Sequence, residues 1–168
     1  RSDVRDKNVM ARTLKNVDGI FPLACITGTP ACLLKPKEAK EVNFDSIKMM
    51  LKLRAKDQII IFPTTNSGYG IGNKNVFCAE NPPLKPISHY AKLKINAESA
   101  VLLSGNSITL RLATVFGISP RMRFDLLVNN FTFMAFFDKH LVLFEPHFMR
   151  NFIHVRDVCK AFILSLDN

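Results

Sequence analysis

The stretch PISHYAKLKINAE at 86–98 places a tyrosine and a lysine four residues apart, at Tyr90 and Lys94. Four residues is just over one helical turn, so a helix would put the phenol and the ammonium on one face. A phenol has an ordinary pKa of about 10, and a nearby cation lowers it by stabilising the phenolate. The pair therefore suits proton transfer to or from a carbinol or carbonyl, which is what hydride transfer to or from a nicotinamide requires.

A candidate partner hydroxyl lies upstream, at Thr65 in FPTTNSGYG (62–70). It could hydrogen-bond the substrate oxygen that Tyr90 protonates or deprotonates. Thr64 is the rival for this role, and a threonine here also suits a helix or turn cap. By itself a Y-x-x-x-K pair is also what a half-buried ring beside a solvated lysine looks like.

The same stretch resembles the P-x-S-x-Y-x-x-x-K-x-x-x-E segment of the extended short-chain dehydrogenase/reductases, the NAD-dependent epimerase/dehydratase family. Further segments resemble other motifs of that family in the same order. They are DVRD at 3–6, GIFPLACITG at 19–28, IIIFPTTNSGYG at 59–70, ITLRLATVFGISPR at 108–121 and RNFIHVRDVCKAF at 150–162. Several motifs in order are more specific than any one of them, and they span nearly the whole chain.

The resemblance implies a catalytic set made of Thr65, Tyr90 and Lys94. Tyr90 would be the general acid and base. Lys94 would lower the pKa of Tyr90 and hydrogen-bond the nicotinamide ribose, while Thr65 would orient the substrate hydroxyl. NAD is the expected cofactor, with NADP as the alternative. The plain interpretations, without catalysis, are a surface tyrosine on the helix at Tyr90, a solvated lysine at Lys94 and a helix or turn cap at Thr65.

The resemblance also implies contacts outside the catalytic set. Those to the cofactor would come from Asp3 near the adenine, from the backbone of Leu23 and Ala24 on the adenosine side, and from Val115 and Phe116 beside the nicotinamide. Those to the substrate would come from Thr65, from Thr114, which stands where the family usually has Asn, and from Arg150, which could pair with a phosphate. The alternatives are a loop acid at Asp3, core packing at the apolar positions and a structural ion pair at Arg150.

The implied activity is that of a sugar-nucleotide epimerase, dehydratase or reductase acting on a hydroxyl or ketone. Asn66 and Ser67 follow Thr65 where a dehydratase commonly has Asp-Glu, which favours epimerase or dehydrogenase chemistry. The sequence contains no G-x-x-G-x-x-G loop to cradle a pyrophosphate. We therefore expect an internal portion of such an enzyme. The alternative is a non-catalytic fragment or binding subunit that cannot hold NAD by itself. A homodimer is possible for this family.

Apolar runs alternate with amphipathic stretches, which predicts an α/β fold with a doubly wound parallel sheet, Rossmann-like and incomplete, followed by the start of a smaller substrate-binding region. We expect an NAD(P)-binding part at 1–120 and a substrate side at 121–168. The expected strands are 18–25, 58–64, 107–115 and 141–145. The expected helices are 38–55, 87–104 and 123–138, the last with a core cluster of phenylalanines. The expected loops are 28–36, which contains Pro30 and Pro36, and 70–86, which would wrap the mouth of the site.

Composition narrows the other possibilities. The 168 residues carry a net charge of +9, and 48% of them are hydrophobic, a share that argues against global disorder. The basic residues are scattered, so nucleic-acid binding would rest on charge alone. No metal site is expected from the four cysteines and four histidines, and Cys25 and Cys159 are expected to be reduced core thiols. No apolar run is long enough to span a bilayer, so we expect a cytoplasmic protein.

Overall fold

The computed structural model describes residues 2–71, 78–81 and 83–167. The chain divides into two compact units, Arg1–Arg111 and Leu112–Asn168, and each is described by itself. The domain boundary expected at 120 stays a prediction. Residues 72–77 and 82 of the loop expected at 70–86 lie outside the described residues.

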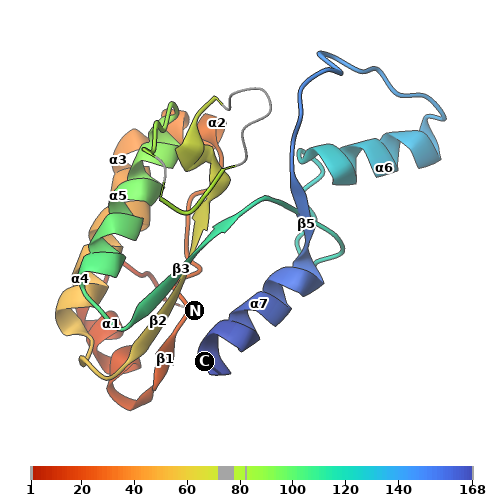
Figure 1. Cartoon of the computed structure of the whole chain (residues 1–168). Coiled ribbons are helices and arrows are strands. Elements are labelled where there is room, and N and C mark those ends of the chain that lie inside the picture. The colour runs from red at the N-terminus through yellow and green to blue at the C-terminus, as the bar shows by residue number, and fades with distance from the viewer. Residues whose placement is uncertain (1, 72–77, 82, 168) are drawn as a thin grey trace. The chain divides into compact units, whose positions relative to one another are not determined.

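The first unit is built on a three-stranded sheet in the order β1-β2-β3 (Figure 1). Its strands are β1 (Gly19–Ile20), β2 (Ile59–Thr65) and β3 (Ser107–Leu112). β1 and β2 are parallel, with Gly19 opposite Ile59, and Ile60 N donates to Asn106 O just before β3. The apolar run of β2 is buried along most of its length, as expected for the central strand of a parallel sheet.

Helices cover this sheet and close its core. They are α1 (Lys7–Thr13), α2 (Thr29–Leu34), α3 (Pro36–Lys40), α4 (Ser46–Leu53) and α5 (His89–Leu103), with short turns η1 (Leu14–Asn16), η2 (Glu41–Asp45) and η3 (Asn66–Tyr69). In Figure 1, α4 and α5 lie side by side against the sheet. Their apolar faces meet the central strand in one cluster, which includes Met50 of α4, Phe62 of β2 and Val101 of α5.

Helix α5 begins and ends where its sequence predicts. The hydroxyl of Ser88 accepts a hydrogen bond from Ala91 N at 3.1 Å, which satisfies a backbone donor of the first turn. Gly105 lies just past the end with φ +70°, a conformation that glycine adopts without steric cost. The helix predicted at 87–104 is therefore confirmed.

Other predicted boundaries in this unit are wrong. The strand expected at 18–25 pairs only at Gly19–Ile20, and it continues as a loop through Pro22, which has no N–H to donate to a ladder. The loop expected at 28–36 contains α2 and the start of α3, because Pro30 and Pro36 occupy first-turn positions, where proline is tolerated. The helix expected at 38–55 is interrupted by the π-helical turn η2.

The second unit contains a two-stranded parallel sheet of β4 (Thr114–Phe116) and β5 (Phe152–His154), with α6 (Leu127–Phe137) and α7 (Val155–Asp167). The strand expected at 107–115 is thus two strands in two sheets. Residues 141–145 form no strand, and their apolar side chains are exposed. Two further predictions are wrong here: Phe133, Phe136 and Phe137 are 43–65% exposed instead of packed in a core, and Cys159 is exposed.

Candidate active site

Tyr90, Lys94 and Glu98 follow one another at every fourth position of α5 and therefore form one stripe along the helix. Lys94 is only 5% exposed, and its Nζ lies 4.1 Å from the centre of the Phe62 ring on β2. Burial lowers the pKa of Lys94, because an ammonium loses its hydration inside the protein. The plain interpretation of Lys94 as a solvated lysine is therefore wrong.

Tyr90 is partly buried and packs against the small cluster formed by Cys32, Ala39 and Leu93. The thiol of Cys25, on the loop after β1, is within hydrogen-bonding reach of Tyr90 and within electrostatic reach of Lys94. Burial raises the pKa of the Cys25 thiol, while Lys94 and the Tyr90 hydrogen bond act in the opposite direction. The structure thus brings Tyr90 and Lys94 together with a thiol that the sequence had indicated only as a core residue.

Thr65 is the last residue of β2, 7% exposed, and its Oγ1 accepts a hydrogen bond from Ser67 N at 3.1 Å. The cap interpretation is therefore confirmed, and the Thr65 hydroxyl still has a proton to donate. The rival, Thr64, is also buried, and its Oγ1 has no hydrogen-bond partner within the described structure. Strand alternation puts Thr64 on the same face of β2 as Phe62. The approach of Thr65 to Tyr90 stays a prediction.

The loop after β1 is held by a residue that sequence reasoning missed. Asn43, 2% exposed in the π-helical turn, accepts from Ile26 N at 2.8 Å through Oδ1 and donates to Ile26 O at 2.9 Å through Nδ2. One side-chain amide therefore satisfies both backbone groups of Ile26. The signal in the sequence is weak: Asn43 and Ser46 are the polar members of a helical side that otherwise carries Ala39, Ile47 and Met50.

Glu98 is 2% exposed and receives the guanidinium of Arg111 from β3, with Nε at 2.8 Å and Nη2 at 2.6 Å from Oε1. Arg111 Nη1 also donates to Tyr69 Oη at 3.2 Å and to Glu80 O at 2.7 Å. Hydrogen bonding to Glu98 raises the pKa of Arg111, which stays charged. This ion pair joins α5, β3 and the turn after β2 around the stripe that carries Tyr90.

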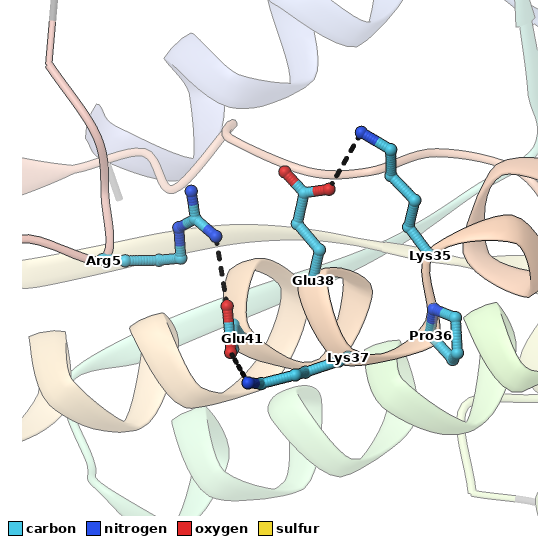
Figure 2. A pocket seen from close by; sticks show the side chains of 6 residues that line it. All are labelled: Arg5, Lys35, Pro36, Lys37, Glu38 and Glu41. Atoms are coloured by element: carbon cyan, nitrogen blue, oxygen red, sulfur yellow. Dashed lines mark hydrogen bonds and ion pairs between the residues drawn. The ribbon is translucent and has the colours of Figure 1, made fainter.

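Asp3 lies at the surface, where its carboxylate accepts from Arg5 N at 2.9 Å and from Arg5 Nη2 at 2.6 Å. The hydrogen bonds from Arg5 lower the pKa of Asp3 to about 2. Arg5 also lines a shallow depression of about 380 Å³ together with residues of α3 and its flanks (Figure 2). Its charged groups already pair with one another: Arg5 and Lys37 with Glu41, and Lys35 with Glu38.

The other residues predicted to contact the cofactor or the substrate have defined positions in the structure, and their contacts stay predictions. Leu23 is 62% exposed and Ala24 is also exposed, so the alternative of strand core is wrong for both. In the second unit Val115 pairs with Ile153. The Phe116 ring lies edge-on to His154 at 5.3 Å between centroids. The other two predicted residues there are Thr114, which is half-buried in β4, and Arg150, which is exposed.

Two kinds of feature are missing from the part of the chain that the structure describes. None of its helices is long and apolar enough to cross a membrane. Within the same residues, no three side chains of His, Cys, Asp or Glu come together as a possible metal site.

Comparison with known proteins identifies the family. The profile of the NAD dependent epimerase/dehydratase family matches residues 1–168. The chain belongs to this family. It is thus a member of an enzyme family of epimerases and dehydratases, and the α/β, Rossmann-like fold with a parallel sheet expected from its motifs is confirmed.

Individual relatives of the epimerase/dehydratase family show how much of the fold is present. The chain is 28% identical over 163 residues to an uncharacterized UDP-glucose epimerase, YtcB, of Bacillus subtilis (strain 168), and the match covers 90% of this chain and 50% of that protein. MoeE5, solved with UDP-glucose and NAD, superposes with a TM-score of 0.81 at 24% identity, covering 98% of this chain and 57% of MoeE5. The UDP-glucuronic acid 4-epimerase of Bacillus cereus, solved with UDP-glucuronic acid and NAD, superposes with a TM-score of 0.83 at 23% identity. This match covers 100% of this chain and 55% of the epimerase. The chain therefore spans about half the length of the relatives it matches.

Proposed function

We propose that this chain carries the proton-transfer site of an NAD-dependent sugar-nucleotide epimerase or dehydrogenase, with Tyr90 as the general acid and base. The observation that carries the proposal is the ammonium of Lys94, buried to 5% exposure one helical turn from Tyr90. A buried ammonium costs stability, so a fold retains one where its charge is used.

The charge of Lys94 has a specific use beside a phenol. In a site of low dielectric constant an ammonium stabilises a phenolate more strongly than it does in water. Tyr90 can then accept a proton from a substrate hydroxyl and return it to a carbonyl oxygen near neutral pH. The Thr65 hydroxyl, at the end of β2, would hold the same substrate oxygen in position.

The cofactor proposal also rests on Lys94. Of the ion pairs formed by the described residues, none includes Lys94, although an ammonium has three protons to donate. This donor set fits the hydroxyls of a nicotinamide ribose. Bound NAD would accept and return the hydride while Tyr90 handles the proton. We assign the backbone of Leu23 and Ala24 to the adenosine side because both residues are exposed on the loop between β1 and α2, which also carries Cys25.

The substrate class comes from the relatives, which include proteins solved with UDP-glucose and with UDP-glucuronic acid. Within this class Asn66 and Ser67 after Thr65 favour epimerase or dehydrogenase chemistry, since a dehydratase needs an additional acid near the reacting hydroxyl. Thr114 and Arg150 are the proposed substrate contacts of the second unit.

The proposed acid and base can be tested without cofactor or substrate. The chain contains two tyrosines and no tryptophan, so the near-ultraviolet absorbance of phenolate reports only Tyr69 and Tyr90. In a Tyr69→Phe background, Tyr90 should ionise at lower pH than free tyrosine. Adding Lys94→Met should move that ionisation to higher pH. If the titration of Tyr90 is the same with and without Lys94, the lysine does not activate the phenol and the proposal fails.

A further inference from the structure

Two cysteines reach the same backbone oxygen beside Tyr90. The Sγ of Cys25 lies 3.6 Å from Ile26 O, and the Sγ of Cys32, on α2, lies 3.3 Å from it. Two atoms that share a neighbour at these distances are at most about 7 Å apart, whereas a disulfide needs about 2 Å. The two sulfur atoms therefore need to come closer by at most about 5 Å to form a bond.

The shared oxygen has more donors than it can satisfy. A carbonyl oxygen offers two lone pairs, and Asn43 Nδ2 already donates to Ile26 O at 2.9 Å. The two thiols compete for what remains, and S–H groups are weak donors. The Cys32 sulfur also accepts a long hydrogen bond from Asn43 Nδ2 at 3.8 Å, so little hydrogen-bond energy holds the Cys25 sulfur and only slightly more holds that of Cys32. Gly28, with φ +88°, lies between the two cysteines, and a glycine can change its backbone angles at less steric cost than other residues.

The surroundings give the two thiols different roles. Cys25 is half-buried, whereas Cys32 is fully buried with 0% exposure. Burial raises the pKa of both thiols, which keeps them protonated and slow to react. Lys94 favours the thiolate of Cys25 alone. Cys25 is thus the thiol that an oxidant meets first, and Cys32 is placed to resolve the product.

We propose that Cys25 and Cys32 form a reversible disulfide that takes the Cys25 thiol away from Tyr90. With a small-molecule disulfide such as oxidised glutathione, the Cys25 thiolate attacks one sulfur and releases one glutathione thiolate. The Cys32 thiolate then attacks Cys25 Sγ, closes the bond between the two cysteines and releases the second glutathione. The two thiol protons end on the two glutathione molecules, so the two cysteines are oxidised and the glutathione disulfide is reduced.

The consequence for activity rests on the proposed role of Tyr90. In the dithiol state the S–H of Cys25 can donate to a phenolate at Tyr90, which favours the ionised form. A disulfide sulfur has no proton to donate, so oxidation makes Tyr90 a weaker acid. The pair would then lower proton-transfer activity under oxidising conditions, in keeping with the redox-sensing use of rare disulfides in reducing compartments.

The disulfide is tested by mass spectrometry on the full chain with Cys78→Ala and Cys159→Ala, which removes the two exposed thiols. Both remaining cysteines fall in one tryptic peptide, residues 16–37. After incubation with oxidised glutathione and alkylation under denaturing conditions, the peptide should be unalkylated and lighter by two hydrogen atoms than its reduced form, and dithiothreitol should restore two alkylation sites. A stable glutathione adduct on Cys25, or two alkylated cysteines after oxidation, would overturn the proposal.

A matched variant separates the pair from Cys25 alone. Adding Cys32→Ser to the same background should leave oxidation at the mixed-disulfide stage, with glutathione on Cys25. If the Cys32→Ser variant does not fold, the mass of peptide 16–37 from the Cys78→Ala, Cys159→Ala protein still decides whether the disulfide forms. The link to Tyr90 is read separately, by phenolate absorbance with Tyr69→Phe added. Oxidation should move the Tyr90 ionisation to higher pH, and an unchanged ionisation with a formed disulfide would overturn the link while keeping the disulfide.

Discussion

Lys94 holds its ammonium nitrogen 4.1 Å from the centre of the Phe62 ring, between α5 and the central strand of the sheet. The ring face is negative, so it partly replaces the water that the ammonium has lost. The replacement is incomplete, because burial still lowers the pKa of Lys94. The protein therefore retains a cation where an apolar side chain would pack at less cost.

Replacing Lys94 by methionine should stabilise the chain while removing the proposed activation of Tyr90. We expect a gain on the order of 1 kcal/mol at pH 7, or roughly 2–4 °C in Tm for a chain of this size. The folded pKa of Lys94 is lowered, so the unfolded chain binds the extra proton, and the stability of the parent rises with pH up to the ordinary value near 10.5. The advantage of methionine should shrink over that range. Thermal melts at neutral and alkaline pH measure both effects, and a destabilised Lys94→Met variant at pH 7 would contradict this account.

Replacing Arg111 by methionine should strongly destabilise the first unit, because it leaves the carboxylate of Glu98 buried at 2% exposure without its cation. Breaking a buried pair in this way typically costs about 3–5 kcal/mol. Adding Glu98→Gln should recover much of the loss, since an amide costs less to bury than a charge. Urea unfolding provides the measurement. The control is Arg5→Met, whose exposed guanidinium should matter little, and a loss at Arg111 no larger than the control would argue against a structural ion pair.

Tyr90→Phe should abolish proton transfer and leave cofactor affinity almost unchanged, because the ring still packs and only the hydroxyl is lost. The measurement needs an active enzyme. A suitable one is a chimera in which this chain replaces the matching portion of a relative that carries the glycine-rich loop. We expect turnover to fall by about two to four orders of magnitude, with the dissociation constant for NAD within a few-fold of the parent. Near-normal turnover would remove Tyr90 from the mechanism.

Residues 1–168 alone should bind NAD weakly or not at all and should self-associate. This sequence lacks the glycine-rich loop that anchors a pyrophosphate. β1 lies at an edge of its sheet, and α6 presents large apolar side chains such as Phe136, which is 65% exposed. Calorimetry measures NAD binding, and light scattering after gel filtration measures the association state. Tight, stoichiometric NAD binding by a monodisperse monomer would contradict both the predicted weak binding and the predicted self-association.

The sequence predicted best those elements whose local signals agree with their packing. Helix α5 has a serine cap and a glycine stop, and its observed bounds follow from these signals. Proline misled the prediction at Pro30 and Pro36, since the same residue that breaks a helix also starts one well. The apolar segment 141–145 has strand-like residues but no strand partner within the described structure, which a local pattern cannot reveal.

For the site, spacing within one helix was enough to place Tyr90 and Lys94 on one face. Contacts between distant segments were not predictable in the same way. Cys25 and Asn43 belong to the site only because the loop after β1 passes beside α5 and η2. The alternatives at Thr64 and Thr65 also depend on which side of β2 each faces, and neighbouring residues of the same type give no local signal for that choice.

The hydrogen bonds from Asn43 to the backbone of Ile26 have a consequence for which substitutions the loop after β1 tolerates. Its two short hydrogen bonds go to main-chain atoms of Ile26, as those of a neighbouring β-strand would, and so do not depend on the side chains of the loop; its contact with a side chain, from Nδ2 to Cys32 Sγ at 3.8 Å, is to α2. Exposed positions such as Leu23 and Ala24 can be substituted without breaking the hydrogen bonds that hold the loop to η2. One buried asparagine thus fixes the backbone of the loop, whatever side chains its exposed positions carry. Substitutions at those positions can therefore change which ligand the loop binds at little cost in stability.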